Sequence, residues 1–234
     1  MKKLVGIIQA RMGSKRVPGK VMIRLKGKPI IQHIKEGLEK SYNFEKIILA
    51  TTSDTRNDEM CNFARKYLNI DIYREDSEDD ICARLYKSTK DLKGIEGIVK
   101  INADCPILDT EVVNEIATKF ASSKVDYVSN KFEWTYPKGL SCEAISINSL
   151  KWCFENITNE KDRELVCDFI KNSDNFSKLD IRSKHQLGHR NWMLDVPKEL
   201  EILNDIFENY HEGPFKYLEL ENYLTSKYGN NYEW

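Results

Sequence analysis

The chain has 234 residues, enough to bury a sizeable core, and we predict one large α/β domain over residues 1–234. Its 36 basic and 37 acidic residues give a net charge of −1, so no global positive field favours nucleic acid. No apolar run approaches the roughly 20 residues of a membrane span, and the first apolar segment is too short for a signal peptide. We therefore expect a soluble, cytoplasmic protein with neither nucleic-acid nor membrane partners.

The cysteines and histidines give no sign of a metal or disulfide framework. The six cysteines are scattered without a Cys-x-x-Cys pair, which favours buried thiols. His185 and His189 have the i, i+4 spacing of a zinc hydrolase motif, but Gln186 stands where that motif needs a glutamate. We therefore disfavour zinc hydrolase chemistry.

The first predicted strand, residues 4–9, is almost wholly apolar, as in a strand buried on both faces of a sheet. It leads into a loop with two glycines, a proline and the cations Arg11, Lys15, Arg16 and Lys20. Glycines let backbone N–H groups approach a ligand, and the cations neutralise phosphate charge. The spacing is not that of a Walker A loop or a dinucleotide fingerprint. Two interpretations follow, a triphosphate-binding loop and a solvated basic turn.

Further strands are predicted at residues 46–51, 70–74, 97–102 and 126–130, with amphipathic helices between most of them. This alternation predicts an α/β fold with a mostly parallel central sheet flanked by helices. Thr110 is expected to cap the helix that follows the third of these strands. The acidic run at residues 75–80 is open to two interpretations, simple helix capping and a ligand site.

The segment from Ile7 to Lys20, I-I-Q-A-R-M-G-S-K-R-V-P-G-K, closely resembles the signature of nucleotidyltransferases with a cytidylyltransferase-type domain. The nearest match is the spore coat polysaccharide biosynthesis protein F family, and acylneuraminate and 3-deoxy-manno-octulosonate cytidylyltransferases are more distant relatives. The resemblance runs from Leu4 to about Glu201. It implies a Rossmann-like nucleotide-diphospho-sugar transferase fold and a single nucleotidyltransferase domain.

The resemblance also implies roles for residues of the first loop and the second segment, S-E-D-D-I-C-A-R. Arg11 and Lys20 would contact phosphates and act in catalysis, and Arg84 would line the substrate pocket. Thr52 follows the second strand, where ligands bind in open α/β sheets. The complete set assigned to the nucleotide is Gln9, Ala10, Arg11, Met12, Gly13, Lys20, Thr52, Ser77, Asp79, Asn102 and Ala103.

Two aspartates are assigned to Mg²⁺ in the same way. I-N-A-D-C-P resembles a family element whose first aspartate binds the metal, which implies that role for Asp104. Asn191 to Pro197, N-W-M-L-D-V-P, resembles an element that would make Asp195 the second carboxylate. We expect both to lie at the ends of strands. Without the resemblance, one aspartate after a strand is more often a turn or cap residue.

The acceptor side departs from the family pattern. Y-P-K-G-L-S-C-E resembles a segment bordering the second substrate, which implies that Gly139 and Glu143 contact it, although an ion pair stays open for Glu143. R-E-L-V-C-D resembles a helix start and assigns Arg163 to the substrate. Ser141 and Leu165 stand where the family has Asp and His, which implies an acceptor unlike that of the type members.

These assignments predict a Mg²⁺-dependent cytidylyltransferase that moves CMP from CTP to a sugar, a sugar acid, or a sugar or polyol phosphate. Pyrophosphate would leave, and the product would serve surface polysaccharide biosynthesis. The alternatives are transfer from another nucleoside triphosphate, a glycosyltransferase using a nucleotide sugar, and a non-catalytic nucleotide-binding protein. Asp104-Cys105-Pro106 lacks the Asp-x-Asp motif typical of the glycosyltransferases.

The last stretch, residues 215–234, is rich in Phe, Tyr, Trp and Leu. An apolar segment of this kind must cover another surface. We expect the protein to form a homodimer, and whether the tail packs on its own domain or on the dimer partner stays open.

Overall fold

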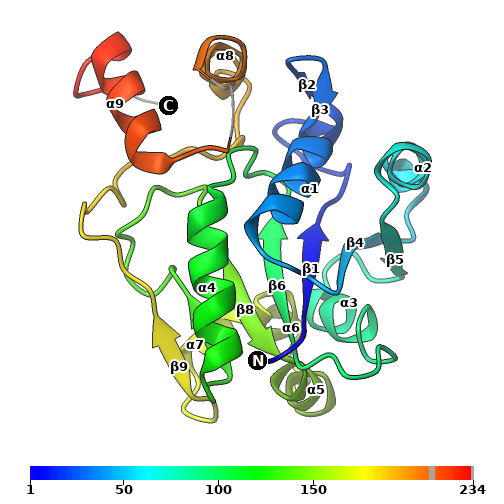
Figure 1. Ribbon diagram of the computed structural model, residues 1–234. Helices are drawn as coiled ribbons and strands as arrows, with labels where there is room; N and C mark the ends of the chain where they lie inside the picture. The colour runs from blue at the N-terminus through cyan, green and yellow to red at the C-terminus, as the bar shows by residue number, and fades with distance from the viewer. Residues whose placement is uncertain (211–213, 233–234) are drawn as a thin grey trace.

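A computed structural model describes residues 1–210 and 214–232, so Trp234 of the aromatic tail lies outside the described residues. Its centre is a seven-stranded sheet of order β5-β4-β1-β6-β8-β7-β9 (Figure 1). The strands are β1 (Leu4–Gln9), β4 (Lys46–Thr52), β5 (Asp71–Glu75), β6 (Gly97–Asn102), β7 (Tyr127–Ser129), β8 (Glu143–Ser146) and β9 (Lys178–Asp180). A separate two-stranded hairpin joins β2 (Arg24–Leu25) and β3 (Lys28–Pro29).

The sheet is mostly parallel, as the sequence predicts. β1 pairs in parallel with β4 and β6, and β4 pairs in parallel with β5. The exception is β8, which runs antiparallel to both β6 and β7. The carboxyl ends of β1 and β6 therefore lie side by side, with Gln9 of one strand paired to Asn102 of the other.

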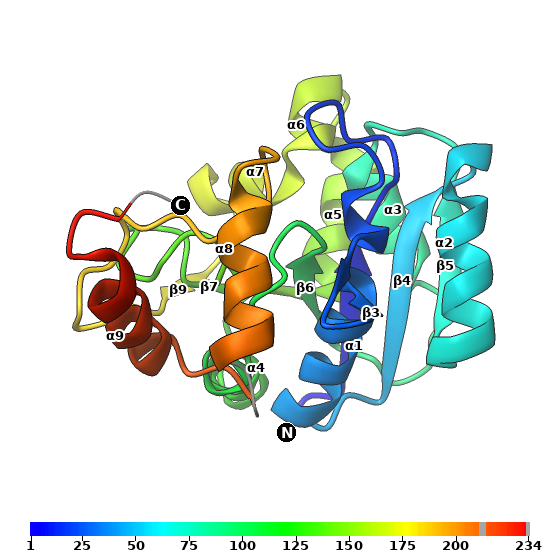
Figure 2. The same ribbon diagram turned by 90° about the horizontal axis from the view of Figure 1, so that it is seen from above.

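The helices cover both faces of the sheet (Figure 2). They are α1 (Ile30–Ser41), α2 (Asp58–Phe63), α3 (Ile81–Lys87), α4 (Thr110–Ser122), α5 (Ile147–Asn156), α6 (Glu160–Glu164), α7 (Val166–Asn172), α8 (Glu199–Asp205) and α9 (Tyr217–Tyr228). Short 3-10 or π-helical turns complete them: η1 (Lys20–Met22), η2 (Thr55–Asn57), η3 (Ala64–Leu68) and η4 (Ile206–Tyr210).

Two apolar cores flank the sheet because successive side chains of a strand point to opposite faces. Leu4 and Ile8 of β1 pack with α1, α4 and the C-terminal helices, whereas Val5 and Ile7 pack with α3, α5 and α7. All four side chains are almost completely buried. This two-sided burial explains why β1 is a nearly continuous apolar run.

Helix α4 begins differently from the prediction. Its cap is Asp109 and not Thr110, because the Asp109 carboxylate accepts hydrogen bonds from the backbone N–H groups of Glu111 (2.9 Å) and Val112 (3.2 Å). The same carboxylate accepts a bond from the N–H of Tyr217 at 2.8 Å. One buried aspartate thus ties the start of α4 to the start of α9, and burial raises its pKa.

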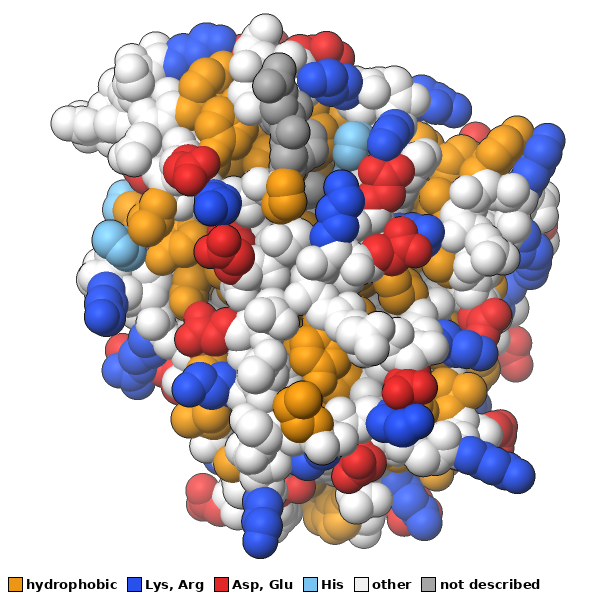
Figure 3. All heavy atoms as spheres, viewed as in Figure 1, with side chains coloured by type: hydrophobic (Ala, Val, Ile, Leu, Met, Phe, Trp, Pro, Cys, Tyr) orange, Lys and Arg blue, Asp and Glu red, His pale blue; other side chains and the backbone are white. Residues whose placement is uncertain are grey.

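The C-terminal tail packs on the same core as α1 and α4. Leu220 and Leu224 of α9 are fully buried there, and the hydroxyl of Tyr232 lies 3.2 Å from Nε1 of Trp192. On the face seen in Figure 3, acidic and basic side chains are interspersed, in keeping with the small net charge. Within residues 1–210 and 214–232, no helix has the length and apolar character needed to cross a membrane.

The buried face of α9 can be tested by truncating one side chain. We expect Leu224→Ala to lower the free energy of unfolding by about 2–5 kcal/mol, because it leaves a cavity in the core. Ser226→Ala, at an exposed position of the same helix, should change it by less than about 0.5 kcal/mol. Chemical denaturation followed by circular dichroism measures both, and equal stability of the two variants would contradict the packing of α9.

Candidate active site

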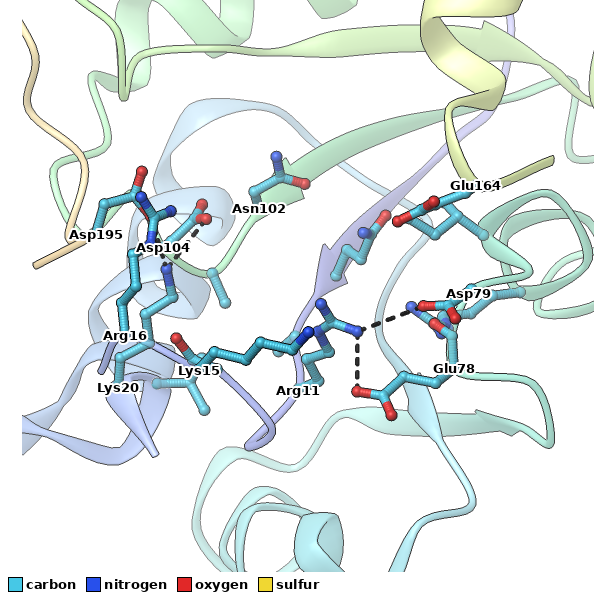
Figure 4. Close-up of a pocket in the computed structure, with 17 residues that line it drawn as sticks. Arg11, Lys15, Arg16, Lys20, Glu78, Asp79, Asn102, Asp104, Glu164 and Asp195 are labelled. Atoms are coloured by element: carbon cyan, nitrogen blue, oxygen red, sulfur yellow. Dashed lines mark hydrogen bonds and ion pairs between the residues drawn. The ribbon is translucent and has the colours of Figure 1, made fainter. Parts of the chain in front are cut away.

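The carboxyl ends of β1 and β6 open on a cavity of about 410 Å³, which Figure 4 shows in close-up. This is the edge of a parallel sheet at which ligands bind in open α/β folds. Most of the residues that the sequence assigns to the site line this cavity. They are Gln9, Ala10, Arg11, Lys20, Asp79, Arg84, Asn102, Ala103, Asp104 and Asp195.

The basic loop after β1 folds back on itself at one wall of the cavity. Gly19 has a positive φ of 67°, and its N–H donates to the carbonyl of Met12 at 3.0 Å. A left-handed conformation of this kind is accessible to glycine without strain. The turn directs Lys15 and Lys20 into the cavity (Figure 4).

Lys20 binds two carboxylates from distant parts of the chain. Its Nζ lies 3.3 Å from Oδ2 of Asp104 and 3.3 Å from Oδ1 of Asp195, and it donates to the carbonyl of Leu194 at 2.8 Å. Arg16 adds a second cation to Asp195 at 2.9 Å. The carboxylates of Asp104 and Asp195 therefore converge on one point, although the sequence separates them widely.

The prediction that both aspartates end a strand is wrong for Asp195. Asp104 follows β6 by two residues, but Asp195 lies in the loop before α8. The carboxylate of Glu199, at the start of α8, holds this loop because it accepts hydrogen bonds from the N–H groups of Asp195 and Val196. The N–H of Leu194 also donates to the carbonyl of Asp104 at 2.8 Å, so backbone contacts bring the two loops together.

The pair of carboxylates fits a magnesium ion. Mg²⁺ prefers oxygen ligands and is usually bound by one or two carboxylates together with substrate phosphates and water. Carboxylate oxygens of Asp104 and Asp195 face one shared position for a cation, and the ammonium group of Lys20 occupies that position. Among the residues that the structure describes, no group of three or more His, Cys, Asp and Glu side chains could hold a metal. Phosphate and water would have to complete the coordination.

Three buried polar atoms that belong to cavity-lining residues have no hydrogen-bond partner within the described parts of the chain: Oε1 of Gln9, Oδ1 of Asn102 and Nε of Arg84. An unsatisfied buried group costs roughly 1–3 kcal/mol, so these atoms indicate a polar ligand. Arg84 is otherwise held by the carbonyls of Ser77 (3.1 Å) and Glu78 (2.6 Å). Burial and the nearby charge of Arg11 lower the pKa of Arg84.

The acidic run at residues 75–80 caps a helix, as one of its two interpretations predicted, and it also lines the cavity. Asp80 caps α3 through the N–H of Ala83 at 2.8 Å, whereas Glu78 and Asp79 line the cavity. Glu78 lies 2.9 Å from Arg11 and Asp79 lies 3.8 Å from it. Capping and charge pairing therefore use different carboxylates of the same run.

Other predicted nucleotide residues stand behind the cavity wall. The N–H of Met12 donates to the side chain of Asn57 at 2.8 Å, and Asn57 in turn donates to Oγ1 of Thr52 at 2.7 Å. Gly13 lies beside Arg56, whose guanidinium would be 3.1 Å from an added Cβ. Together with Ser77, these residues shape the loops and do not line the cavity.

Of the residues predicted to contact the acceptor, Arg84 lines the cavity, whereas Gly139, Glu143 and Arg163 lie away from it. Gly139 has a φ of 107°, and an added Cβ would be 2.8 Å from the backbone of Trp192, so glycine allows two loops to touch. The guanidinium of Arg163 binds Asp80 and the carbonyls of Phe154 and Ile157.

Glu143 is buried in an ion pair. Its carboxylate lies 2.7 Å from Lys100 and 3.6 Å from Lys131, and it accepts a hydrogen bond from Tyr127 at 2.6 Å. Burial by itself would raise the pKa of Glu143, but the two lysines outweigh it and hold the pKa below its usual range. This arrangement matches the ion-pair interpretation, and Glu143 does not line the cavity.

The site assignment missed several lining residues, notably Ser14, Lys15, Arg16, Glu78 and Glu164. Glu164 ends α6 and lines the cavity (Figure 4). Its neighbour Arg163 does not line the cavity and binds Asp80 instead. The signal was present in the sequence, because both residues match the family pattern. That pattern does not tell which of the two faces the site, and the structure places Glu164 there.

A basic loop after the first strand of a mostly parallel sheet, facing a pair of carboxylates, defines the class as nucleotidyltransferase. The family model described as cytidylyltransferase matches residues 5–226. The chain belongs to this cytidylyltransferase family and is a nucleotidyltransferase enzyme. The resemblance seen in the sequence is thereby confirmed at the level of the family.

Relatives agree with this assignment. An uncharacterised protein of Methanocaldococcus jannaschii is 33% identical over 76% of this chain and 70% of its own length. A 3-deoxy-manno-octulosonate cytidylyltransferase of Bdellovibrio bacteriovorus is 32% identical over 64% of this chain and 57% of its own length. One from Hydrogenovibrio crunogenus is 27% identical over 95% of this chain and 85% of its own length.

Solved structures share the fold. A cytidylyltransferase of Leptospira borgpetersenii superposes over 100% of both chains with a TM-score of 0.89 and 21% identity. A CMP:2-keto-3-deoxy-manno-octonic acid synthetase complexed with CTP superposes over 88% of this chain and 98% of its own, with a TM-score of 0.65 and 16% identity. At these identities the likeness shows the fold alone.

The contribution of the buried ion pair between Glu143 and Lys100 to stability can be tested with a double-mutant cycle. Glu143→Gln and Lys100→Met should each lower the free energy of unfolding by about 3–5 kcal/mol, because each leaves a buried charge without its partner. The double variant should lose less than the sum of the two. Glu155→Gln, in an exposed pair with Lys151, is the control and should cost less than about 1 kcal/mol. Additive losses in urea denaturation would contradict the pairing.

Proposed function

We propose that this chain is a Mg²⁺-dependent cytidylyltransferase that transfers CMP from CTP to a sugar, a sugar acid, or a sugar or polyol phosphate. One observation carries the proposal: Asp104, Asp195 and Lys20 converge in the cavity that the basic loop borders. A site that only binds nucleotide has no need for two carboxylates facing a triphosphate loop. The family and the names of the relatives support CTP and a sugar-type acceptor.

In the proposed reaction, an acceptor oxygen attacks the α-phosphorus of CTP in line with the bond to the β-phosphate oxygen. That bond breaks, pyrophosphate leaves with the bonding electrons, and the acceptor oxygen loses its proton to solvent or to a nearby base. The product serves surface polysaccharide biosynthesis. Magnesium would supply charge neutralisation at the phosphates, and Asp104 and Asp195 would hold it.

The protein contributes position and charge, the main sources of catalysis when little covalent chemistry is needed. Arg11 and Lys20 bind the phosphates and stabilise the charge that develops on pyrophosphate. Gln9, Asn102 and Arg84 supply the unpartnered polar atoms that orient the nucleoside and the acceptor. Two neighbouring strands and α3 carry these side chains, so their positions are set by rigid elements.

The first experiment is pyrophosphate release with Mg²⁺, screening CTP, UTP, GTP and ATP against pooled acceptors. The pool contains sugar phosphates, polyol phosphates, hexoses and sugar acids such as 3-deoxy-manno-octulosonate. We expect release with CTP and one acceptor class. Release only with another triphosphate would overturn the choice of CTP, and binding of CTP without release from any acceptor would favour a non-catalytic nucleotide-binding protein.

If Asp104 and Asp195 hold the metal, substitution of either carboxylate should reduce turnover and leave the fold intact. Asp104→Asn and Asp195→Asn should each reduce Mg²⁺-dependent pyrophosphate release by about 100-fold or more, since an electrostatic contact to the reacting phosphates is worth several kcal/mol. Asp91→Asn, at an exposed position, is the matched control and should keep full activity. A wild-type rate of pyrophosphate release in Asp104→Asn or Asp195→Asn would contradict the assignment of that aspartate to the metal.

The proposed contact between Lys20 and the phosphates can be tested separately through nucleotide binding. Lys20→Met removes one charged hydrogen-bond donor, so we expect affinity for a non-hydrolysable CTP analogue to fall by about 10- to 100-fold. Lys28→Met, in an exposed pair with Glu36, makes the same change outside the cavity and should have little effect. Isothermal titration calorimetry measures both, and equal affinities would refute the phosphate role of Lys20.

A further inference from the structure

The two carboxylates assigned to magnesium are already paired with cations of the protein itself. Asp195 Oδ1 lies 2.9 Å from Arg16 and 3.3 Å from Lys20, and Asp104 Oδ2 lies 3.3 Å from the same lysine. The other oxygen of Asp104 accepts a weak hydrogen bond from the thiol of Cys105 at 3.4 Å. Two cations and two carboxylates thus form one neutral cluster where the metal would bind.

Burial makes the lysine the stronger of the two contacts. The Lys20 side chain is 12% exposed, and those of Asp195 and Asp104 are 20% and 29% exposed, so water screens these pairs only partly. Lys20 also has a hydrogen bond to the carbonyl of Leu194. The Arg16 side chain is 63% exposed, and an exposed pair is worth little.

We propose that Lys20, assisted by Arg16, occupies the carboxylates of Asp104 and Asp195 and so keeps a free divalent cation from binding to them. Lys20 and Arg16 release these carboxylates only when a triphosphate binds. The proposal rests on the proposed function and concerns the regulation of the same site. A triphosphate competes for Lys20 and Arg16 because both cations border the cavity and phosphate is a strong acceptor for them. Once they turn to phosphate, Asp104 and Asp195 are released to bind the metal.

Charge balance explains why the metal and the triphosphate must enter together. A bare divalent cation would add two positive charges to a neutral cluster that contains two cations, and it would find only two protein ligands there. A metal–triphosphate complex brings an anion for the cations and a cation for the carboxylates. Each ion then exchanges one partner for another, and no buried charge is left unpaired.

This exchange predicts that removal of a cation improves metal binding. The probe is Mn²⁺, followed by electron paramagnetic resonance on the full chain without nucleotide. Wild-type protein should bind it weakly, and Lys20→Met should bind it about 10-fold more tightly or better, because Asp104 loses its lysine partner and Asp195 keeps only the exposed Arg16 of its two cation partners. Arg16→Met should give a smaller gain.

The cavity offers a matched control in Lys15. It lines the same cavity but makes no ion pair with another residue of the described chain, so Lys15→Met removes the same charge without freeing a ligand. Its Mn²⁺ affinity should stay within about threefold of the wild type. The double variant Lys20→Met/Asp104→Asn should lose the gain of the single variant, which locates the bound ion at Asp104.

Each result supports or overturns the exchange. Equal Mn²⁺ affinity of wild type and folded Lys20→Met overturns it, as does an equal gain in Lys15→Met. A gain that survives Asp104→Asn also overturns it, because the ion would then bind elsewhere. Pyrophosphate release by the wild type tests the proposed function separately. If the wild type turns over but Lys20→Met gains no Mn²⁺ affinity, only the proposed exchange of ion partners is overturned. If Lys20→Met gains Mn²⁺ affinity but the wild type releases no pyrophosphate, only the transferase assignment is overturned.

Discussion

The ammonium group of Lys20 joins three segments of the chain into one site. It belongs to the loop after β1 and contacts Asp104 beyond β6 and Asp195 before α8. The backbone bond between Leu194 and Asp104 reinforces this junction. If these loops did not meet, the basic loop would be a solvated turn, and each aspartate would be an ordinary loop residue.

The sheet makes this meeting possible. Because β1 and β6 are adjacent and parallel, with Gln9 paired to Asn102, their following loops leave the same edge at the same height. Helices α8 and α9 pack on the first core and lie toward the end of the sheet to which β1 and β6 point (Figure 1). The loop that carries Asp195 leads directly into α8. Stability and function are thus linked, since the C-terminal helices help to place a carboxylate of the site.

Charge pairing runs through the whole cavity. Arg11 pairs with Glu78, Arg16 and Lys20 pair with Asp195, and Lys20 also reaches Asp104. The pairs of Arg11 and Arg16 are exposed and contribute little by themselves, whereas the Lys20 pairs are more buried. In the exchange that we propose, a triphosphate and its metal would replace these pairs one for one. Under that proposal, the pairs that balance charge in the cavity would also prepare it for a highly charged substrate.

The sequence by itself determined β1, β4, β5, β6 and β7 in their order, the basic loop and the family, because these depend on local periodicity and on contiguous motifs. It did not predict the short strands β8 and β9, which complete the sheet. It also assigned Asp104 and Asp195 to one site, and both line the cavity, although it placed Asp195 at a strand end. Only the tertiary structure decided that Asp109 caps α4, that Glu143 is buried against Lys100, and that Glu164 faces the cavity in place of Arg163. These outcomes depend on contacts between residues far apart in the chain, and local patterns carry no information about such contacts.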